Sequence, residues 1–535
     1  MIRAKFSPHR LYRELVDAIE RECRVAEWRA GDVDLWPLAS QDLFGDIFRQ
    51  AGGESAAPPA HFAVRAAGTL ATPLLNLWKS RRDPAHRLLS PYRADAVLLG
   101  DGVSLDRVDG AWRDRFAEPI AAALELQGRS CFMMQSGNLA RLPWARPTYA
   151  ANLVAARAAV AAALSKDSVF HLADHSAVVR LVERAGIAAP SLALERLARR
   201  ARVVAAQAAA FDHIFRQVRP SIAFVVTYYA GLGHAFALAC RRRGLLCVDL
   251  QHCPHDGSHR GYRWSTMPPQ GYSTLPGLFW TWTDADAADI RRWSDRRSKR
   301  WHDAIGGGHP QIAALCSGEG ERLWQVALGL TGDRRYEREI LVALQPIGGR
   351  THIWDALAKI IHSAPAGWRW WIRRHPASSV VQDRVYGRLL SLDRSNVVIG
   401  EAAQIALPAL LGHMNALVSL ASGAAAEAAM FGIPALFLDR EACDAFPLLI
   451  ARGEAEVVEV GALISAIATM TDQASRHRPT LTSIEDILRR IERLAKDYAR
   501  LCDETAHEKV DRGARIIRES HPPRAVRRER LDRAS

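Results

Sequence analysis

The feature that most constrains this chain is a repeated alternation between short apolar runs and longer stretches of helical composition. In the first half, the apolar runs are the candidate strands 95–99, 130–134, 168–172, 221–227, 245–250 and 279–283. Ala-rich segments such as 149–165 and 193–218 lie between them, and alanine is the residue that most favours helix. Short strands that alternate with helices predict a parallel sheet covered by helices on both faces.

The alternation restarts after a Gly-Gly-Gly break at 306–308. The candidate strands of the second half are 339–344, 369–372, 396–399, 416–420, 434–438 and 456–460. A chain of 535 residues is too long for one ordinary core. We therefore predict an α/β fold with two Rossmann-like, doubly wound domains that face a cleft, followed by a C-terminal helical extension. The predicted domains are 1–290, which begins with a helical extension, 291–475, helices over 476–519, and a basic disordered tail over 520–535.

Composition and charge limit the class of protein. The chain is 49% hydrophobic and 24% charged, which is typical of a soluble globular protein. Its net charge of +13 suits phosphate-bearing partners, or else is a basic surface without a partner. No nucleic-acid-binding motif accompanies the charge, so we expect no nucleic-acid partner. The basic tail fits contact with anionic lipid, and equally no partner at all.

The cysteines and the N-terminus bear on the compartment. The eight cysteines form no CxxC motif and no disulfide framework, which indicates a reducing environment. The N-terminus reads as an amphipathic helix without the apolar core of a signal peptide. We expect a cytoplasmic protein, with the basic tail allowing peripheral contact with the inner membrane.

Ligands of doubly wound sheets bind beyond the carboxyl ends of the strands, so the residues after each strand carry most of the functional information. Gly348 and Gly349 follow strand 339–344, where they allow backbone amides to approach a phosphate or simply form a turn. Arg373, Arg374 and His375 follow strand 369–372 and form a dense cationic group, which Pro376 ends. This second cluster predicts an anion site; the alternative is solvated arginines and a histidine that caps a helix.

The strand 416–420 ends in a second candidate phosphate site. Ser422 and Gly423 offer a hydroxyl and free amides at a strand-to-helix junction. Glu427 lies one helical turn further on, where it reaches a ribose hydroxyl or caps the turn. The alternative is a serine N-cap with tight helix packing.

Two of these runs together resemble a known family. RRHP at 373–376 and SLASGAAAEAAMFGIP at 419–434 resemble the HP and Ser motifs of bacterial GT-B glycosyltransferases, in particular the sialyltransferases and Kdo transferases of capsule and lipopolysaccharide assembly. The resemblance implies a GT-B-like fold and a CMP-sugar donor, with His375 at the donor phosphate, Ser422 beside it and Glu427 near the ribose or base. It extends less specifically over about residues 220–460. The Ser motif often has two adjacent hydroxyl residues, but Gly423 follows Ser422 here, so a UDP- or GDP-sugar stays open.

The resemblance also assigns the first half. In GT-B enzymes the N-terminal domain holds the acceptor and often the catalytic base. Asp101 lies where related enzymes carry an acidic-acidic-Gly motif, although Gly100 replaces the first acid; an Asp-Gly turn is the alternative. Gln251 and His252 resemble a QHG segment followed by an aromatic, Pro-rich lid, with Cys253 in place of the glycine. We expect His252 or Asp101 to be catalytic.

The acceptor-side residues expected around these candidates follow two strand ends or belong to the lid. They are Gln251, His255 and Tyr229.

Two metal-binding sites are alternative interpretations of these residues. His252, Cys253, His255, Asp256 and His259 have the ligand types of a zinc site, but no second ligand cluster is evident elsewhere in the sequence. Asp284-Ala285-Asp286 resembles a metal-binding DxD, although Thr283 and Asp286 are more simply spaced to cap a helix. We therefore expect no metal and no cofactor.

The expected activity is transfer of a sugar from a nucleotide-sugar donor to a glycan or glycolipid acceptor in bacterial surface polysaccharide biosynthesis. Two alternatives stay open. One is a sugar-nucleotide epimerase of the same fold, and the other is a non-catalytic nucleotide- or glycan-binding module of an assembly complex.

Overall fold

The structure is a computed structural model of the full chain, of which the greater part is described. The described residues are 7–51, 91–108, 110–136, 144–165, 169–255, 259–294, 300–316, 327, 329, 336–345, 351–375, 386–400, 402, 405–474, 477 and 482–520, with side chains up to 505.

The first half forms a seven-stranded parallel sheet in the order β12-β11-β10-β9-β3-β6-β7. Its strands are β3 (Ala96–Gly100), β6 (Cys131–Gln135), β7 (Thr148–Ala150), β9 (Ile222–Val226), β10 (Cys247–Leu250), β11 (Leu278–Thr281) and β12 (Asp303–Gly306). The chain starts in the middle at β3, adds strands on one side, and then crosses to β9 and adds strands on the other. This is the doubly wound Rossmann order, and the switch point lies between β3 and β9. The sheet reaches β12, beyond the boundary predicted at residue 290.

The second half repeats the plan with six parallel strands in the order β15-β14-β13-β16-β17-β18. They are β13 (Arg338–Ala343), β14 (Trp368–Arg373), β15 (Val397–Val398), β16 (Ala416–Ser419), β17 (Ala435–Phe437) and β18 (Ala455–Val457). The switch point of this sheet lies between β13 and β16. All six predicted strands of this half are present within a few residues of their predicted positions.

Helices cover both faces of each sheet, as the buried, near-continuous apolar strands require. In β3, Val97 and Leu99 belong to one core and Ala96 and Leu98 to another, because successive side chains point to opposite faces. The helices of the first domain are α1 (Pro8–Glu22), α2 (Trp36–Gln50), α4 (Ala117–Leu126), α5 (Asn152–Leu164), α6 (His175–Arg184), α7 (Leu194–Val218), α8 (Gly233–Arg242) and α9 (Asp284–Ser294). Those of the second are α10 (Pro310–Leu315), α12 (Thr351–Ser363), α14 (Gly387–Leu390), α15 (Leu407–Leu411), α16 (Ala424–Met430), α17 (Ala442–Ala445), α18 (Pro447–Ala451) and α19 (Leu463–Gln473).

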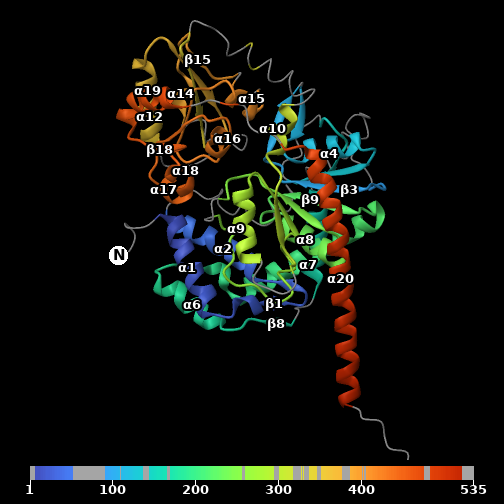
Figure 1. Cartoon of the computed structure of the whole chain (residues 1–535). Coiled ribbons are helices and arrows are strands. Elements are labelled where there is room, and N and C mark those ends of the chain that lie inside the picture. The colour runs from blue at the N-terminus through green and yellow to red at the C-terminus, as the bar shows by residue number, and fades with distance from the viewer. Residues whose placement is uncertain are drawn as a thin grey trace, which may run out of the picture.

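One predicted strand is placed elsewhere. The run 168–172 forms only the two-residue strand β8 (Phe170–His171), which pairs antiparallel with β1 (Arg29–Ala30) and not with the large sheet. With β2 (Val33–Asp34) they make a small separate sheet beside α1 and α2 (Figure 1). The reason is burial: Phe170 is half-buried and His171 exposed, whereas strands of the large sheet are buried on both faces.

A hairpin that the sequence analysis did not anticipate follows β3. It consists of β4 (Leu105–Val108) and β5 (Ala111–Asp114), and leads into α4. Because it begins at the carboxyl end of β3, it stands beside the switch point of the first sheet.

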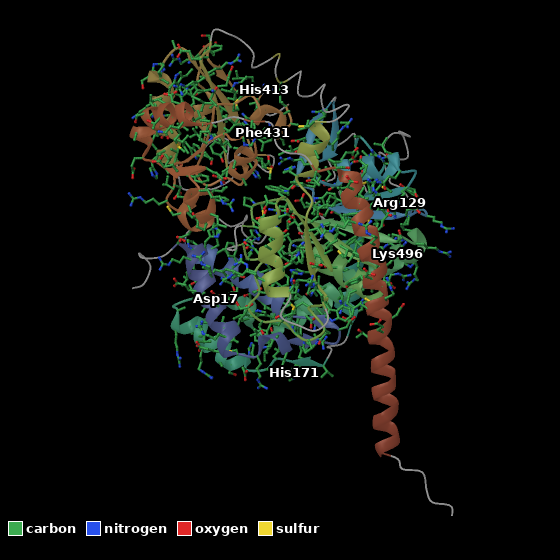
Figure 2. The ribbon with its side chains drawn as sticks, in the orientation of Figure 1. Asp17, Arg129, His171, His413, Phe431 and Lys496 are labelled. Atoms are coloured by element: carbon green, nitrogen blue, oxygen red, sulfur yellow. The ribbon has the colours of Figure 1, made fainter. Side chains whose placement is uncertain are left out.

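The last helix, α20 (Ile484–Ser520), returns from the second half to the first domain. Its buried residues Ile487, Leu488 and Ile491 join the core on the α4 side of the first sheet. Arg129, before β6, pairs with Glu492 on this helix, and Figure 2 labels Arg129 together with Lys496 of the same helix. The C-terminal part of α20 projects beyond the body of the first domain (Figure 1).

The predicted cap of α20 shifts by one residue. The hydroxyl of Ser483, rather than that of Thr482, accepts a hydrogen bond from the Asp486 amide at 3.2 Å. Among the described residues, no helix has both the length and the apolar character needed to cross a membrane.

Candidate functional site

The switch points of both sheets open onto one cavity of about 490 Å³. Gly100 at the end of β3, Asp101 after it and Thr227 after β9 line the cavity from the first domain. Leu344 after β13 and Ser422 after β16 line it from the second. A volume in this range is typical of small-molecule sites. The predicted fold class, two Rossmann-like domains facing a cleft with a C-terminal helical extension, is thereby confirmed.

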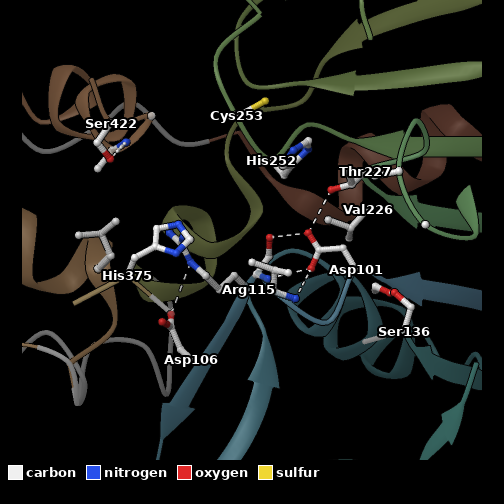
Figure 3. Close-up of a pocket in the computed structure, with 18 of the residues that line it drawn as sticks. Asp101, Asp106, Arg115, Ser136, Val226, Thr227, His252, Cys253, His375 and Ser422 are labelled. Atoms are coloured by element: carbon white, nitrogen blue, oxygen red, sulfur yellow. Dashed lines mark hydrogen bonds and ion pairs between the residues drawn. The ribbon is translucent and has the colours of Figure 1, made fainter. Parts of the chain in front are cut away.

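The second-domain wall carries most of the predicted anion-binding residues. Arg373, Arg374, His375, Ser422 and Gly423 all line the cavity. Figure 3 shows His375 and Ser422 on the same side of the pocket, opposite Asp101. Burial, followed by the charges of Arg115 and Arg373, lowers the pKa of His375 to about 4, so the imidazole is neutral at pH 7.

Glu427 lines the cavity but is already paired across the domain boundary. Arg115, directly after β5 of the first domain, donates two hydrogen bonds to its carboxylate at 2.8 and 2.9 Å. The Nε2 of His309 lies 3.5 Å from the same carboxylate. Burial alone would raise the pKa of Glu427, but Arg115 and His309 outweigh it and lower the pKa to about 2. Glu427 is therefore a charged partner of Arg115 in this conformation.

Arg373 is likewise used inside the protein. Its guanidinium donates to the carbonyl oxygens of Ala402 and Ile405, the latter at 2.6 Å, and lies 3.4 Å from Asp106 of hairpin strand β4. Gln311 joins the two pairs, because it donates to Asp106 at 2.6 Å and accepts from Arg115 at 2.9 Å. Four charges of alternating sign thus link the domains at the floor of the cavity.

Asp101 is held tightly at the end of β3. One carboxylate oxygen accepts from the amides of Val103 and Ser104, and the other from the hydroxyls of Ser104 and Thr227, at distances of 2.8 to 3.0 Å. Thr227 has a φ of +61°, which a β-branched residue rarely adopts. Such strain at a sheet's switch point is typical of a functional site. The four bonds leave Asp101 few acceptor positions for a substrate proton.

His252 lines the cavity and belongs to a chain of three side chains. The Tyr229 hydroxyl lies 3.0 Å from His252 Nε2 and 3.1 Å from His259 Nε2. His259 Nδ1 accepts from the Gly261 amide, so its neutral ring carries the proton on Nε2 and donates to Tyr229. Tyr229 then donates to His252, which places the proton of neutral His252 on Nδ1.

His252 has a lowered pKa, and the backbone at the following Cys253 is unstrained. Burial lowers this pKa to about 4, with Asp101 opposing the shift and Arg260 adding to it. Cys253, where the resemblance led us to expect glycine, is not one of the described non-glycine residues with a positive φ. The cysteine therefore introduces no backbone strain of that kind after His252.

Two predicted acceptor-side residues lie outside the cavity. Gln251 is buried and ties β10 to β11, since its side chain accepts from the Trp282 amide and donates to the Cys253 carbonyl. His255 is buried against the ring of Tyr262. Tyr229, in contrast, lines the cavity as expected. Gly348, Gly349 and Pro376 lie outside the described residues.

The structure bears on the two metal sites considered above, the histidine-rich loop and the DxD motif. In the part of the chain that is described, no group of three or more His, Cys, Asp or Glu side chains is arranged to hold a metal ion; Asp256 lies outside that part. The predicted helix cap at Thr283 is confirmed, because its hydroxyl accepts from the Asp286 amide at 3.0 Å.

Several residues of the site escaped the sequence analysis. Asp106 and Arg115 lie in or just after a hairpin, not at the end of a parallel strand, so the rule that directed attention to strand ends passed over them. Gln345 does follow a strand: its side-chain amide exchanges two 2.7 Å hydrogen bonds with the backbone of Ala421, which joins the ends of β13 and β16. A polar residue directly after EILVAL was a signal that could have identified it.

No protein-family model matches the chain, and neither does any curated protein. Among solved structures, the chain is similar to UDP-GlcNAc 2-epimerase from Methanocaldococcus jannaschii, in complex with UDP-GlcNAc and UDP, at 12% identity and a TM-score of 0.45 over 74% of this chain and 98% of that one. It is also similar to UDP-GlcNAc 2-epimerase from Neisseria meningitidis bound to UDP-GlcNAc, at 14% identity and a TM-score of 0.41 over 75% of this chain and 100% of that one. The glycosyltransferase SnogD from Streptomyces nogalater is similar at 14% identity and a TM-score of 0.36, over 78% of this chain and 99% of that one. Likenesses at these values carry no argument about activity, and the fold assignment rests on the strand orders above.

Proposed function

We propose that this chain is a GT-B-type glycosyltransferase that moves a sugar from a nucleotide donor to a glycan or glycolipid acceptor. The observation that carries the proposal is the single cavity onto which the switch points of both Rossmann-like sheets open. Each doubly wound sheet offers a ligand site at its switch point, and we place the donor at one of these sites and the acceptor at the other, with their reacting groups between them. The resemblance of RRHP and SLASG favours a CMP-sugar and a role in surface polysaccharide assembly.

The donor is placed against the second domain. Arg374, His375 and Ser422 are the groups proposed to receive its phosphate, and they would offset the negative charge that develops on the leaving nucleotide. Arg373 and Glu427 do not contact the donor phosphate in this proposal. They hold hairpin strand β4 and Arg115 against the donor side through the paired charges described above.

The acceptor is placed against the first domain, with His252 as the base. The acceptor hydroxyl takes the position of the Tyr229 hydroxyl at His252 Nε2. As its oxygen forms the bond to the sugar carbon, the bond from that carbon to the donor phosphate breaks, and the proton moves to Nε2. A pKa of about 4 makes His252 a weak base in the empty cleft. The negative charge of a bound donor would raise that pKa towards neutrality.

Nucleotide binding is the first test. A thermal-unfolding panel with CMP, UDP, GDP and CDP should show stabilisation by one nucleotide, about 2.7 kcal/mol at a concentration one hundred times its Kd. His375→Ala should reduce this shift, while His213→Ala, on the exposed side of α7, should preserve it. If His375→Ala binds the nucleotide as the wild type does, the donor site is not where we place it.

Product analysis separates the candidate activities. A transferase consumes the donor sugar only when an acceptor is present; an epimerase converts it without one; a binding module leaves it unchanged. His252→Ala should abolish transfer while nucleotide still binds. Full transfer by both His252→Ala and His375→Ala, with the fold intact, would refute the proposed mechanism.

A further inference from the structure

A second, smaller cavity of about 260 Å³ lies behind the His252 side of the main cavity. Its walls come from helices α1 and α2 of the N-terminal extension, from Tyr229 after β9, from the segment after β10, and from Gly423, Ala445 and Phe446 of the second domain. We call this space the side chamber. It is closed by both domains, so it exists only when they are together.

The side chamber adjoins the main cavity. The residues that line both are Tyr229, His252, Cys253, Arg260 and Gly423. A ligand whose reacting hydroxyl reaches His252 from the main cavity therefore has room to continue past it. The chamber belongs to the acceptor's side of the site, because His252 is the group at which we place the acceptor hydroxyl.

Aromatic rings form much of the wall. Tyr12 and Phe44 pack edge to face with ring centroids 5.2 Å apart, and His9 lies 5.4 Å from Phe44. Tyr229 and Phe446 contribute from the opposite sides. Rings of this kind offer flat apolar faces to the C–H groups of a sugar, and a narrow chamber of this size suits one sugar unit better than a nucleotide.

One permanent charge faces this aromatic wall. The Arg260 guanidinium lies 4.1 Å from the centroid of Phe44 and donates from Nε to Gln41 at 2.6 Å. No described carboxylate is within ion-pairing distance of it, and no Asp or Glu appears among the described residues of the chamber wall. This distinguishes Arg260 from Arg115 and Arg373, which are matched by Glu427 and Asp106.

The remaining polar groups of the wall are neutral. Burial, and then Arg260, lowers the pKa of His9 to about 4, although Asp444 opposes the shift. Burial and the charge of Arg260 also lower the pKa of His259. The Nε2 atom of His9 lies 3.5 Å from a carboxylate oxygen of Glu441, a residue that does not line the chamber. At pH 7 the chamber thus offers aromatic faces, neutral imidazoles suited to hydroxyl groups, and one positive charge.

We propose that the side chamber binds a saccharide unit of the acceptor that carries an anionic group, with its ring against the aromatic wall and its carboxylate or phosphate on Arg260. The proposal rests on the proposed function and names the chemical class of its acceptor. An anionic partner adds a Coulomb attraction to the half-buried guanidinium that a neutral hydroxyl lacks, and a carboxylate or phosphate can accept two parallel hydrogen bonds from it.

The test is direct binding of three probes to the full chain by saturation-transfer NMR: glucuronate, glucose 6-phosphate and glucose. Glucuronate or glucose 6-phosphate should bind at least tenfold more tightly than glucose, and the better of the two identifies the anion as carboxylate or phosphate. Arg260→Met should remove this preference. Arg263→Met, three residues further along the same segment and paired with Asp17, should keep it.

Three results would overturn the proposal: no probe binds the wild type, glucose binds as tightly as the anionic probes, or Arg260→Met leaves the preference unchanged. A loss of nucleotide binding in Arg260→Met, with saccharide binding intact, would instead assign Arg260 to the donor phosphate and also overturn it. Arg260→Lys, which keeps the charge, guards against misfolding and should retain part of the preference.

The outcome is separable from that of the proposed function. Saccharide binding is measured without nucleotide, and nucleotide binding without saccharide. Nucleotide binding together with a failed saccharide test removes only the side-chamber assignment, whereas the absence of nucleotide binding removes the proposed transferase.

Discussion

At the scale of single residues, the cleft contains two kinds of polar group. Arg115, Glu427, Arg373 and Asp106 satisfy one another across the domain boundary, whereas His252 depends on a neighbour for its protonation pattern. The first kind holds the walls of the site in place. The second can act as a general base, because an imidazole that is neutral at pH 7 can accept a proton from a substrate hydroxyl.

Tyr229→Phe tests the chain that sets the tautomer of His252. The substitution leaves the His259 Nε2–H without its acceptor and His252 Nε2 without its donor, and an unsatisfied buried group costs about 1–3 kcal/mol. We expect a lower free energy of unfolding in urea, and a His252 ring whose two tautomers become mixed in ¹⁵N NMR spectra. Tyr92→Phe is the control: it removes a hydroxyl that donates to the Cys131 carbonyl far from His252, so it should cost about 0.5–1.5 kcal/mol and leave the His252 spectrum unchanged. An unchanged His252 spectrum in Tyr229→Phe would contradict the assigned tautomer.

Gly100→Ala tests the packing at the end of β3. A Cβ at Gly100 would overlap the side chains of Gln135 and Asp114, which are themselves hydrogen-bonded at 2.7 Å. Overpacking of this kind costs about 1–3 kcal/mol. Gly45→Ala, in the middle of α2 with only the tip of Arg49 nearby, is the matched control and should gain about 0.5–1 kcal/mol. Equal stability of the two variants would show that the crowding at Gly100 is absent in solution.

At the scale of elements, the β4–β5 hairpin and α20 each connect parts that the sheets alone would leave apart. The hairpin carries Asp106, and Arg115 follows it directly; both reach residues of the second domain. Helix α20 comes after the second domain in the chain yet packs on the first (Figure 1). The chain therefore crosses the domain boundary twice, once at α10 and again before α20, which limits how far the domains can separate.

Ile491→Ala tests the docking of α20. Ile491 is fully buried in the core shared by this helix and the first sheet, so its truncation should cost about 2–5 kcal/mol. Chemical denaturation measures the loss, and Arg493→Ala, on the exposed face of the same helix, should stay within about 0.5 kcal/mol of the wild type. A small effect for Ile491→Ala would mean that α20 is detached from the first domain.

At the scale of the whole molecule, the buried pairs between the domains determine how the site is closed. Arg115 and Glu427 come from different domains and are both buried. Removing one partner of such a pair leaves the other charge uncompensated, whereas removing both is much less costly.

Glu427→Gln should therefore destabilise the protein by about 3–5 kcal/mol, and the double variant Arg115→Met with Glu427→Gln by much less. Urea unfolding of both single variants and the double variant forms a double-mutant cycle that isolates the pairwise energy. If the single and double variants are equally destabilised, the two side chains do not interact in the folded protein.

The pH dependence of this pair has a defined sign. The pKa of Glu427 is lowered to about 2 from its usual 4.5, so the stabilisation is complete above pH 4.5 and is lost as pH falls towards 2. The wild type should lose stability relative to Glu427→Gln over that window, as measured by thermal unfolding at a series of pH values. A constant difference between the two proteins from pH 5 to pH 2.5 would contradict the assigned pKa.

The two alternating sets of strands and helices follow from the amino-acid pattern alone, because an apolar run that must be buried on both faces has few other solutions. The same pattern also directed attention to His252, His375 and Ser422, which line the cavity, since each follows such a run and the carboxyl ends of parallel strands meet at one edge. Gln251 and His255 show the limit of that rule: position after a strand does not fix the direction of a side chain.

The charges that face one another, in contrast, are set by the packing of the two domains. Arg115 and Glu427 are separated by 312 residues along the chain, and no local pattern records their contact. The same holds for the side chamber, whose walls come from the N-terminal helices, the segment after β10 and the second domain. Pairings of this kind depend on how the completed domains pack, and that packing is a property of the assembled surfaces rather than of any stretch of sequence.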